Sequence, residues 1–186
     1  MRRGSAIGLA LLAACSATSV GPYTTLTEET RSTTEAEQLN RRAADLITSD
    51  PGRAESLLRD ALTKDIYFGP AHNNLGVLYL KAGKLYEAAN ELEWARKLLP
   101  GNPDPRINLG LVLERAGRTE EALKAYEAAL EVTPECIAAT QGAASLVIRS
   151  RWNDRRLASW LGYIATRGEP EAWRRWALDQ SSSGLR

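Results

Sequence analysis

Apolar positions in the middle of the chain recur three and four residues apart, which is the spacing of one face of a helix. Leu75 lies on one such face, and Leu92 lies on a second face with small alanines beside it. Gly83 separates the two stretches, where a helix can end in the left-handed conformation that glycine adopts without steric cost. Pro100 follows the second stretch and cannot continue a helix. The pattern predicts a pair of helices over residues 69–102.

The whole pattern returns 34 residues further along the chain. Asn74-Leu75-Gly76 is followed at that interval by Asn108-Leu109-Gly110, and ten of the 34 aligned positions are identical, against roughly two expected from average residue usage. A repeat of this length indicates a stack of helix pairs in which each pair covers the apolar face of its neighbour. We therefore expect an all-α solenoid whose extended surface favours binding over catalysis.

A weaker copy of the repeat precedes these two. Segment 35–68 matches in its second helix, and its first helix matches after a one-residue deletion, because Arg42 would otherwise occupy the close-packing glycine position. The deletion shifts Asn40 out of the row that contains Asn74 and Asn108. It also places three apolar residues on one face, namely Leu39, Ala43 and Leu46.

Residues 137–180 form a more divergent unit, as terminal repeats usually do because one face must meet water. Ile137–Ile148 is predicted to be a first helix, capping helices rich in tryptophan and arginine follow, and residues 181–186 are expected to be a disordered tail. Proline at position 170 is typical of a helix start. Two roles are open for the helix after it: a cap over the end of the solenoid, or a patch that docks a protein or anionic lipid head groups. The patch would consist of Trp173, Arg174, Arg175 and Trp176.

Segments 69–102 and 103–136 resemble tetratricopeptide repeats in their small, aromatic and proline positions, although His72 and Arg106 stand where the family usually has tryptophan. The resemblance implies a short right-handed solenoid of helix hairpins over 35–136 with a C-terminal helical cap. It also implies that the first helices line a concave groove for a protein or peptide. The inward positions carried over from the family are Asn73, Asn74, Val77, Leu80, Lys81, Ile107, Asn108, Leu111, Glu114 and Arg115.

Asn74 and Asn108 occupy equivalent positions in this groove. In the family this asparagine often binds the backbone of a peptide, a task that suits an amide because it both donates and accepts hydrogen bonds. The same asparagine also occurs in repeats without a known ligand. The basic cluster that some members use to hold a C-terminal carboxylate is absent, with Leu39 and Asp104 at two of its positions. The apolar inward side chains favour an apolar ligand, extended or helical.

The N-terminus predicts export. Arg2 and Arg3 precede an apolar stretch that is shorter than the about 20 residues needed to span a bilayer, so residues 1–14 are interpreted as a signal peptide. Leu12-Ala13-Ala14-Cys15 resembles the signal of bacterial lipoproteins, which implies cleavage before Cys15 and a diacylglycerol plus an acyl chain on it, enough for stable anchoring. The alternative is an ordinary secretory signal with a coincidental cysteine. Residues 15–34, rich in serine and threonine, are interpreted as a tether.

The charge balance and the available side chains argue against nucleic-acid binding and against catalysis. Segment 35–136 holds 13 Lys and Arg against 17 Asp and Glu, whereas 137–186 holds eight Arg against four acids, a balance too weak for a nucleic-acid footprint. His72 is the only histidine, and Cys136 is the only cysteine left after lipidation. Cys136 can be buried as a small apolar residue or form an intermolecular disulfide. We find no metal set, cofactor motif or catalytic constellation.

These observations predict a non-catalytic, lipid-anchored protein that mediates protein–protein contacts in the cell envelope, at the periplasmic face of the outer membrane. Its layout is similar to that of pilotins and of helper lipoproteins in outer-membrane assembly, so an adaptor or assembly factor is expected. The alternative is a scaffold that recruits a soluble periplasmic enzyme, such as a protease or a cell-wall hydrolase.

Overall fold

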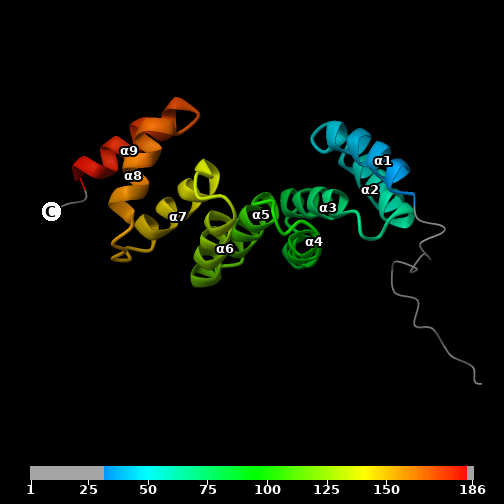
Figure 1. The fold of residues 1–186 in the computed structure, drawn as a ribbon, viewed down its shortest axis with the longest axis horizontal. Coiled ribbons are helices and arrows are strands. Elements are labelled where there is room, and N and C mark those ends of the chain that lie inside the picture. The colour runs from blue at the N-terminus through cyan, green and yellow to red at the C-terminus, as the bar shows by residue number, and fades with distance from the viewer. Residues whose placement is uncertain (1–31, 184–186) are drawn as a thin grey trace, which may run out of the picture.

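The computed structural model describes residues 32–183, which fold into helices without a strand. Consecutive helices pack as hairpins, and Figure 1 shows these hairpins following one another along an elongated arc. The expected all-α solenoid of hairpins is confirmed. In chain order the helices are α1 (Thr33–Leu46), α2 (Pro51–Lys64), α3 (Gly69–Lys81), α4 (Leu85–Leu98), α5 (Asp104–Arg115), α6 (Thr119–Val132), α7 (Ile137–Arg149), α8 (Leu157–Arg167) and α9 (Glu171–Ser183).

Two glycines form the turns inside the central hairpins. Gly83 and Gly117 have φ angles of 75° and 74°, and an added Cβ would meet no atom within 4 Å at either position. Backbone conformation therefore selects glycine here, not lack of space. In both turns a backbone N–H then reaches back to the preceding helix: Lys84 donates to the carbonyl of Tyr79 at 2.9 Å, and Arg118 donates to that of Leu113 at 2.8 Å. These bonds satisfy carbonyl groups at the helix end.

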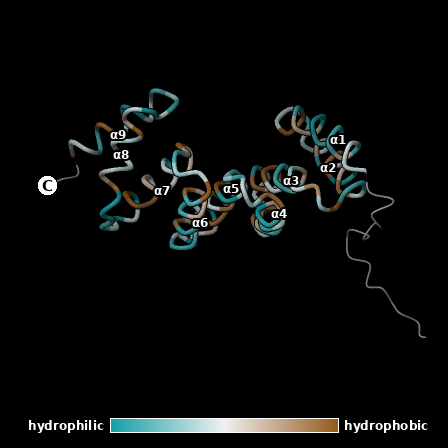
Figure 2. Tube along the Cα trace, viewed as in Figure 1, coloured by the Kyte–Doolittle hydropathy of each residue, from teal (hydrophilic) through white to brown (hydrophobic). Residues whose placement is uncertain are grey.

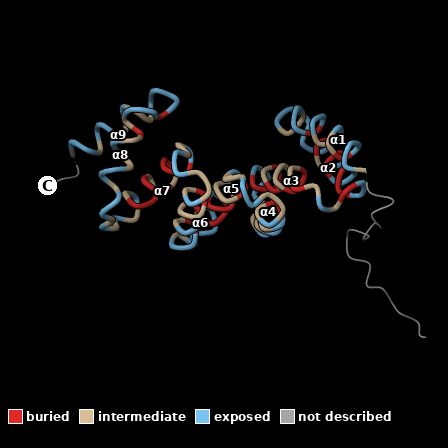
Figure 3. Tube along the Cα trace, viewed as in Figure 1, coloured by how far each residue is buried: buried red, intermediate tan, exposed pale blue. Residues whose placement is uncertain are grey.

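Helix backbones approach closely where the repeat carries small residues. A Cβ on Gly76 would lie 2.6 Å from Cγ of Leu92. Gly110 of α5 and Gly142 of α7 would each place a Cβ 2.6 Å from Cε1 of Tyr126, so this fully buried ring is held between two successive first helices. Figures 2 and 3 show the same pattern along the chain, with hydrophobic, buried residues on the inner sides of the helices. At Tyr126 the joint between α6 and α7 is therefore as close as the contact inside the α5–α6 hairpin.

The first helix confirms the one-residue deletion. Ala43 is fully buried whereas Arg42 is exposed, so Ala43 takes the close-packing position that Gly76 and Gly110 hold in the next repeats. The start of α1 corrects the predicted tether of residues 15–34, because Thr33 and Thr34 are already helical. Ser32 caps this helix by accepting a hydrogen bond from the N–H of Glu35 at 3.4 Å. The signal peptide, Cys15 and the rest of the tether lie outside the described residues.

The C-terminal helices form a second, smaller core. Its buried members are Ala144, Leu161, Ile164 and Ala177, which come from α7, α8 and α9. The predicted disordered tail of residues 181–186 also needs correction, because Ser181–Ser183 continue α9. The hydroxyl of Ser181 donates to the carbonyl of Ala177 at 2.8 Å, which uses its one donor within the helix. Within residues 32–183 every helix is too short or too polar to traverse a bilayer.

Candidate functional site

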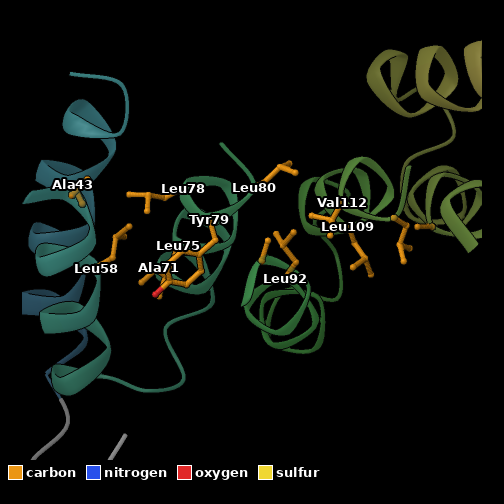
Figure 4. Packing of buried hydrophobic residues seen from close by; sticks show 14 of the residues in the cluster. Ala43, Leu58, Ala71, Leu75, Leu78, Tyr79, Leu80, Leu92, Leu109 and Val112 are labelled. Carbon is orange, nitrogen blue, oxygen red and sulfur yellow. The ribbon is translucent and has the colours of Figure 1, made fainter. Parts of the chain in front are cut away.

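The first helices of the hairpins form one continuous face. Contacts join α1 to α3, α3 to α5 and α5 to α7, while α4 and α6 lie on the outer side of the arc in Figure 1. Of the ten side chains expected to face inward, Lys81, Leu111 and Arg115 are exposed, and most of the others are half-buried. Leu80 is the exception: it is only 6% exposed and belongs to the core. Figure 4 shows Leu80 between α3 and α5, where the next hairpin covers it.

The groove asparagines bind one another across the repeats. The side-chain amide of Asn108 donates to Oδ1 of Asn73 at 3.0 Å, and that of Asn74 donates to Oδ1 of Asn40 at 2.8 Å. With the one-residue deletion, Asn40 is the counterpart of Asn73, so one bond recurs at two joints. Asn40 therefore lies on the groove face as the counterpart of Asn73. Its 34-residue interval from Asn74, taken alone, suggests instead that it is the counterpart of Asn74. Each bond uses one N–H of the donor amide. Within residues 32–183, Asn74 and Asn108 make no hydrogen bond through their second side-chain N–H or through Oδ1.

A row of three cations follows one edge of this face. Lys81, Arg115 and Arg149 occupy the last turns of α3, α5 and α7, which is favourable because a helix C-terminus carries partial negative charge. Each reaches the preceding repeat: Lys81 donates to Oγ1 of Thr48 at 3.1 Å and Arg115 to the carbonyl of Leu80 at 2.8 Å. Arg149 was not among the predicted site residues, although its 34-residue interval from Arg115 identifies it.

Glu114 connects the third cation to the core. Its carboxylate accepts hydrogen bonds from the buried hydroxyl of Tyr126 and from the guanidinium of Arg149. Burial raises the pKa of Tyr126 well above its usual range, and the hydrogen bond to Glu114 raises it further. The phenol therefore stays protonated and acts as a donor. Glu114 lies in the groove as expected, but its charge is already compensated by Arg149.

Two apolar hollows extend the groove toward the C-terminus. One, of about 430 Å³, lies between α5 and α7 and is lined by Ile107, Leu111 and Glu114 among others. The other, of about 350 Å³, lies between α7 and the start of α9. Both are lined by Ser145, Arg149 and Trp173. The last helix therefore contributes directly to the groove.

The four residues of the expected docking patch have different partners in the structure. The rings of Trp173 and Trp176 meet edge to face with centroids 5.1 Å apart, and both pack on the second core. Trp173 lines both hollows, whereas Trp176 lines only the second. Arg174 donates to the carbonyl of Gly168 at 3.3 Å, and Arg175 lies 3.8 Å from the carboxylate of Glu171. The tryptophans thus cap the solenoid and, through Trp173, also shape its groove.

His72 lies away from this face. It is 1% exposed, and its ring contacts the carboxylate of Glu91 through Nδ1 at 2.6 Å and the carbonyl of Ile66 through Nε2 at 2.8 Å. Its ring stacks on Trp94. Cys136 is half-buried and forms no disulfide within residues 32–183. Among residues 32–183 no three His, Cys, Asp or Glu side chains gather as metal ligands would.

Comparison with known proteins assigns the repeats. A family model described as tetratricopeptide repeat matches residues 73–144. The sequence has no match among curated proteins. Several solved structures share the fold at 18–19% identity. The first tetratricopeptide domain of Spaghetti (RPAP3), bound to the HSP90 peptide SRMEEVD, has a TM-score of 0.62 at 19% identity and covers 66% of this chain and 98% of its own.

Two microbial proteins have similar folds. MamA from Desulfovibrio magneticus gives a TM-score of 0.58 at 18% identity, over 81% of this chain and 78% of its own. The tetratricopeptide domain of Sgt2 from Aspergillus fumigatus gives 0.62 at 19% identity, over 68% and 85%. At these identities the likeness concerns the fold alone. The family model thus identifies residues 73–144 as tetratricopeptide repeats, and the solved structures show that the same fold extends over more of the chain.

Proposed function

We propose that this chain is a non-catalytic, lipid-anchored adaptor that holds segments of other proteins in its groove, in the bacterial cell envelope. The tetratricopeptide fold is that of a protein–protein interaction scaffold. The observation that carries the proposal is the composition of the face formed by the first helices, which carries the amide groups of Asn74 and Asn108 and, between α5 and α7, an apolar hollow. Amides can bind a peptide backbone while hollows take its side chains.

The solved relatives support this assignment of the groove. One of them holds an HSP90 peptide in a domain that this chain matches over 98% of its length. The lipid anchor rests on the sequence Leu12-Ala13-Ala14-Cys15. An anchored solenoid is suited to assembling envelope machinery, in the manner of a pilotin or a helper lipoprotein. Recruitment of a soluble periplasmic enzyme is the second role that the same layout allows.

Site-specific photo-crosslinking in living cells tests the groove. A photoreactive residue at Leu111, which is 42% exposed on the groove, should trap discrete protein adducts. The matched control is Tyr86 of α4, which is 77% exposed and does not line either hollow. Adducts formed equally at both positions would contradict a binding groove.

Cys15→Ala tests the anchor and separates the two roles. Metabolic labelling with a palmitate analogue should mark the wild-type chain and leave the variant unmarked. An assembly factor should lose its envelope partners in the variant because it no longer reaches the membrane. A recruiting scaffold should crosslink the same soluble enzyme in both forms. Equal labelling of both forms would rule out lipidation at Cys15.

A further inference from the structure

The groove has an unbalanced charge along one edge. Lys81 and Arg115 are both exposed, and among the ion pairs of residues 32–183 neither takes a carboxylate partner. Glu114, the acidic side chain at the same end of the face, is compensated by Arg149. The edge therefore carries uncompensated positive charge, whereas segment 35–136 as a whole is net negative. Such a local reversal steers an acidic partner to this edge.

Apolar surface lies next to this charge. The two hollows meet at Trp173 and Arg149, so a partner side chain in either hollow is close to a guanidinium. Arg149 uses Nη2 for Glu114 and Nε for the carbonyl of Ser145 at 3.3 Å. A guanidinium has five N–H donors, so it can bind a further carboxylate without releasing Glu114.

We propose that the groove binds an acidic segment of a partner protein, with bulky apolar side chains in the two hollows and carboxylates along Lys81, Arg115 and Arg149. This inference rests on the proposed function and specifies the chemical class of the partner segment. Packed helices lie about 8–10 Å apart, and an extended chain advances about 3.3 Å per residue. Carboxylates spaced roughly three residues apart therefore match the cations on successive first helices.

Designed peptides test this chemistry without knowledge of the natural partner. The probe is a fluorescein-labelled peptide that repeats Glu-Phe-Ser, measured by fluorescence anisotropy with the folded chain. One control peptide carries Lys in place of Glu, and a second has the same composition with its glutamates adjacent. We expect the spaced acidic peptide to bind most tightly and its affinity to fall with added salt. Equal binding of the lysine peptide would overturn the proposal.

Variants of the chain locate the site. Ala172 is exposed and lines the second hollow, so Ala172→Glu adds a carboxylate there without removing packing, in a helix turn that favours acidic residues. It should weaken the acidic peptide about fivefold, while Ala172→Lys should not weaken it. Lys81→Glu with Arg115→Glu should weaken it about tenfold or more. The matched reversal on α4 and α6, Lys97→Glu with Lys124→Glu, should leave affinity unchanged.

The outcomes separate this inference from the proposed function. If Leu111 traps a protein in cells and the spaced acidic peptide neither binds nor competes, the groove function stands and the acidic partner is wrong. If the peptide binds but Ala172→Glu and the Lys81–Arg115 reversal have no effect, the peptide occupies another surface and the proposal fails. Thermal melting of each variant excludes unfolding as the cause of any loss.

Discussion

The side-chain amide of Asn108 donates a hydrogen bond to Oδ1 of Asn73, one repeat earlier, at 3.0 Å. The same bond joins Asn74 to Asn40 at 2.8 Å. These asparagines therefore have two tasks, since they link consecutive first helices and also present amide groups to the groove. A loss of ligand binding after their removal has to be separated from a loss of stability.

A double-mutant cycle measures the structural task. Asn73→Ala and Asn108→Ala should each lower the free energy of unfolding by about 1 kcal/mol, because each removes one partner of a half-buried hydrogen bond. The double variant should cost less than the sum of the two, since the second change removes a bond already lost. Urea denaturation gives these values. Asn90→Ala, at an exposed position of α4, serves as the control and should be near neutral.

The binding task is tested with the complementary pair. Asn74→Ala with Asn108→Ala should weaken peptide or partner capture beyond any change in stability, because both remove amide groups from the groove. Asn73→Ala, which breaks the joint to Asn108 but keeps the amides of Asn74 and Asn108, is the matched comparison. Equal loss of capture in both variants would assign the effect to repeat packing. Unchanged affinity in the double variant would remove the asparagines from the binding site.

A close approach of helices makes a third prediction. Gly110→Ala would place a Cβ 2.6 Å from the buried ring of Tyr126 and should destabilise the fold by about 1–3 kcal/mol. Gly162→Ala is the control, because Gly162 is exposed within α8 and an added Cβ meets no atom within 4 Å. The control should stabilise the helix by roughly 0.5–1 kcal/mol. Melting temperatures that move in the same direction would contradict this packing.

The cap makes a fourth prediction. Trp176 packs on the second core, so Trp176→Ala should lower the free energy of unfolding by about 2 kcal/mol, less than for a fully buried tryptophan. Leu178→Ala, at a side chain 58% exposed on the same helix, should have little effect. Thermal melting measures both. A Trp176 variant of wild-type stability that has lost a partner would instead support the docking patch.

Sequence alone predicted the hairpins because each is defined by local residues, such as the turn glycines Gly83 and Gly117 and the small packing positions. It did not predict that Leu80 is buried. The family pattern marks this position as inward, and only the folded chain shows that the next repeat covers it. The contribution of Trp173 was missed for a related reason. Beyond α7 the 34-residue pattern drifts, and only the folded chain places α9 beside the groove.

Ionisation of Tyr126 gives the fifth prediction. Burial raises the pKa of its phenol in the folded state, so the unfolded chain loses this proton more readily. The stabilisation is therefore fully present below the unfolded pKa of about 10 and is lost as pH rises above it. Tyr126→Phe removes the titrating group and should cost about 1 kcal/mol at neutral pH, through the lost bond to Glu114.

Urea denaturation of both proteins from neutral pH to about pH 11 isolates this effect. The unfolded tyrosine gains about 1.4 kcal/mol by ionising at one pH unit above its pKa, so the wild-type advantage should disappear near pH 11. Lysines and the other tyrosines titrate in both proteins, and their contribution cancels in the difference. A gap between wild type and Tyr126→Phe that stays constant up to pH 11 would mean that the phenol ionises as readily in the folded chain as in the unfolded one. The ring would then not be sealed between α5 and α7, and the tight joint inferred at Gly110 and Gly142 would be wrong.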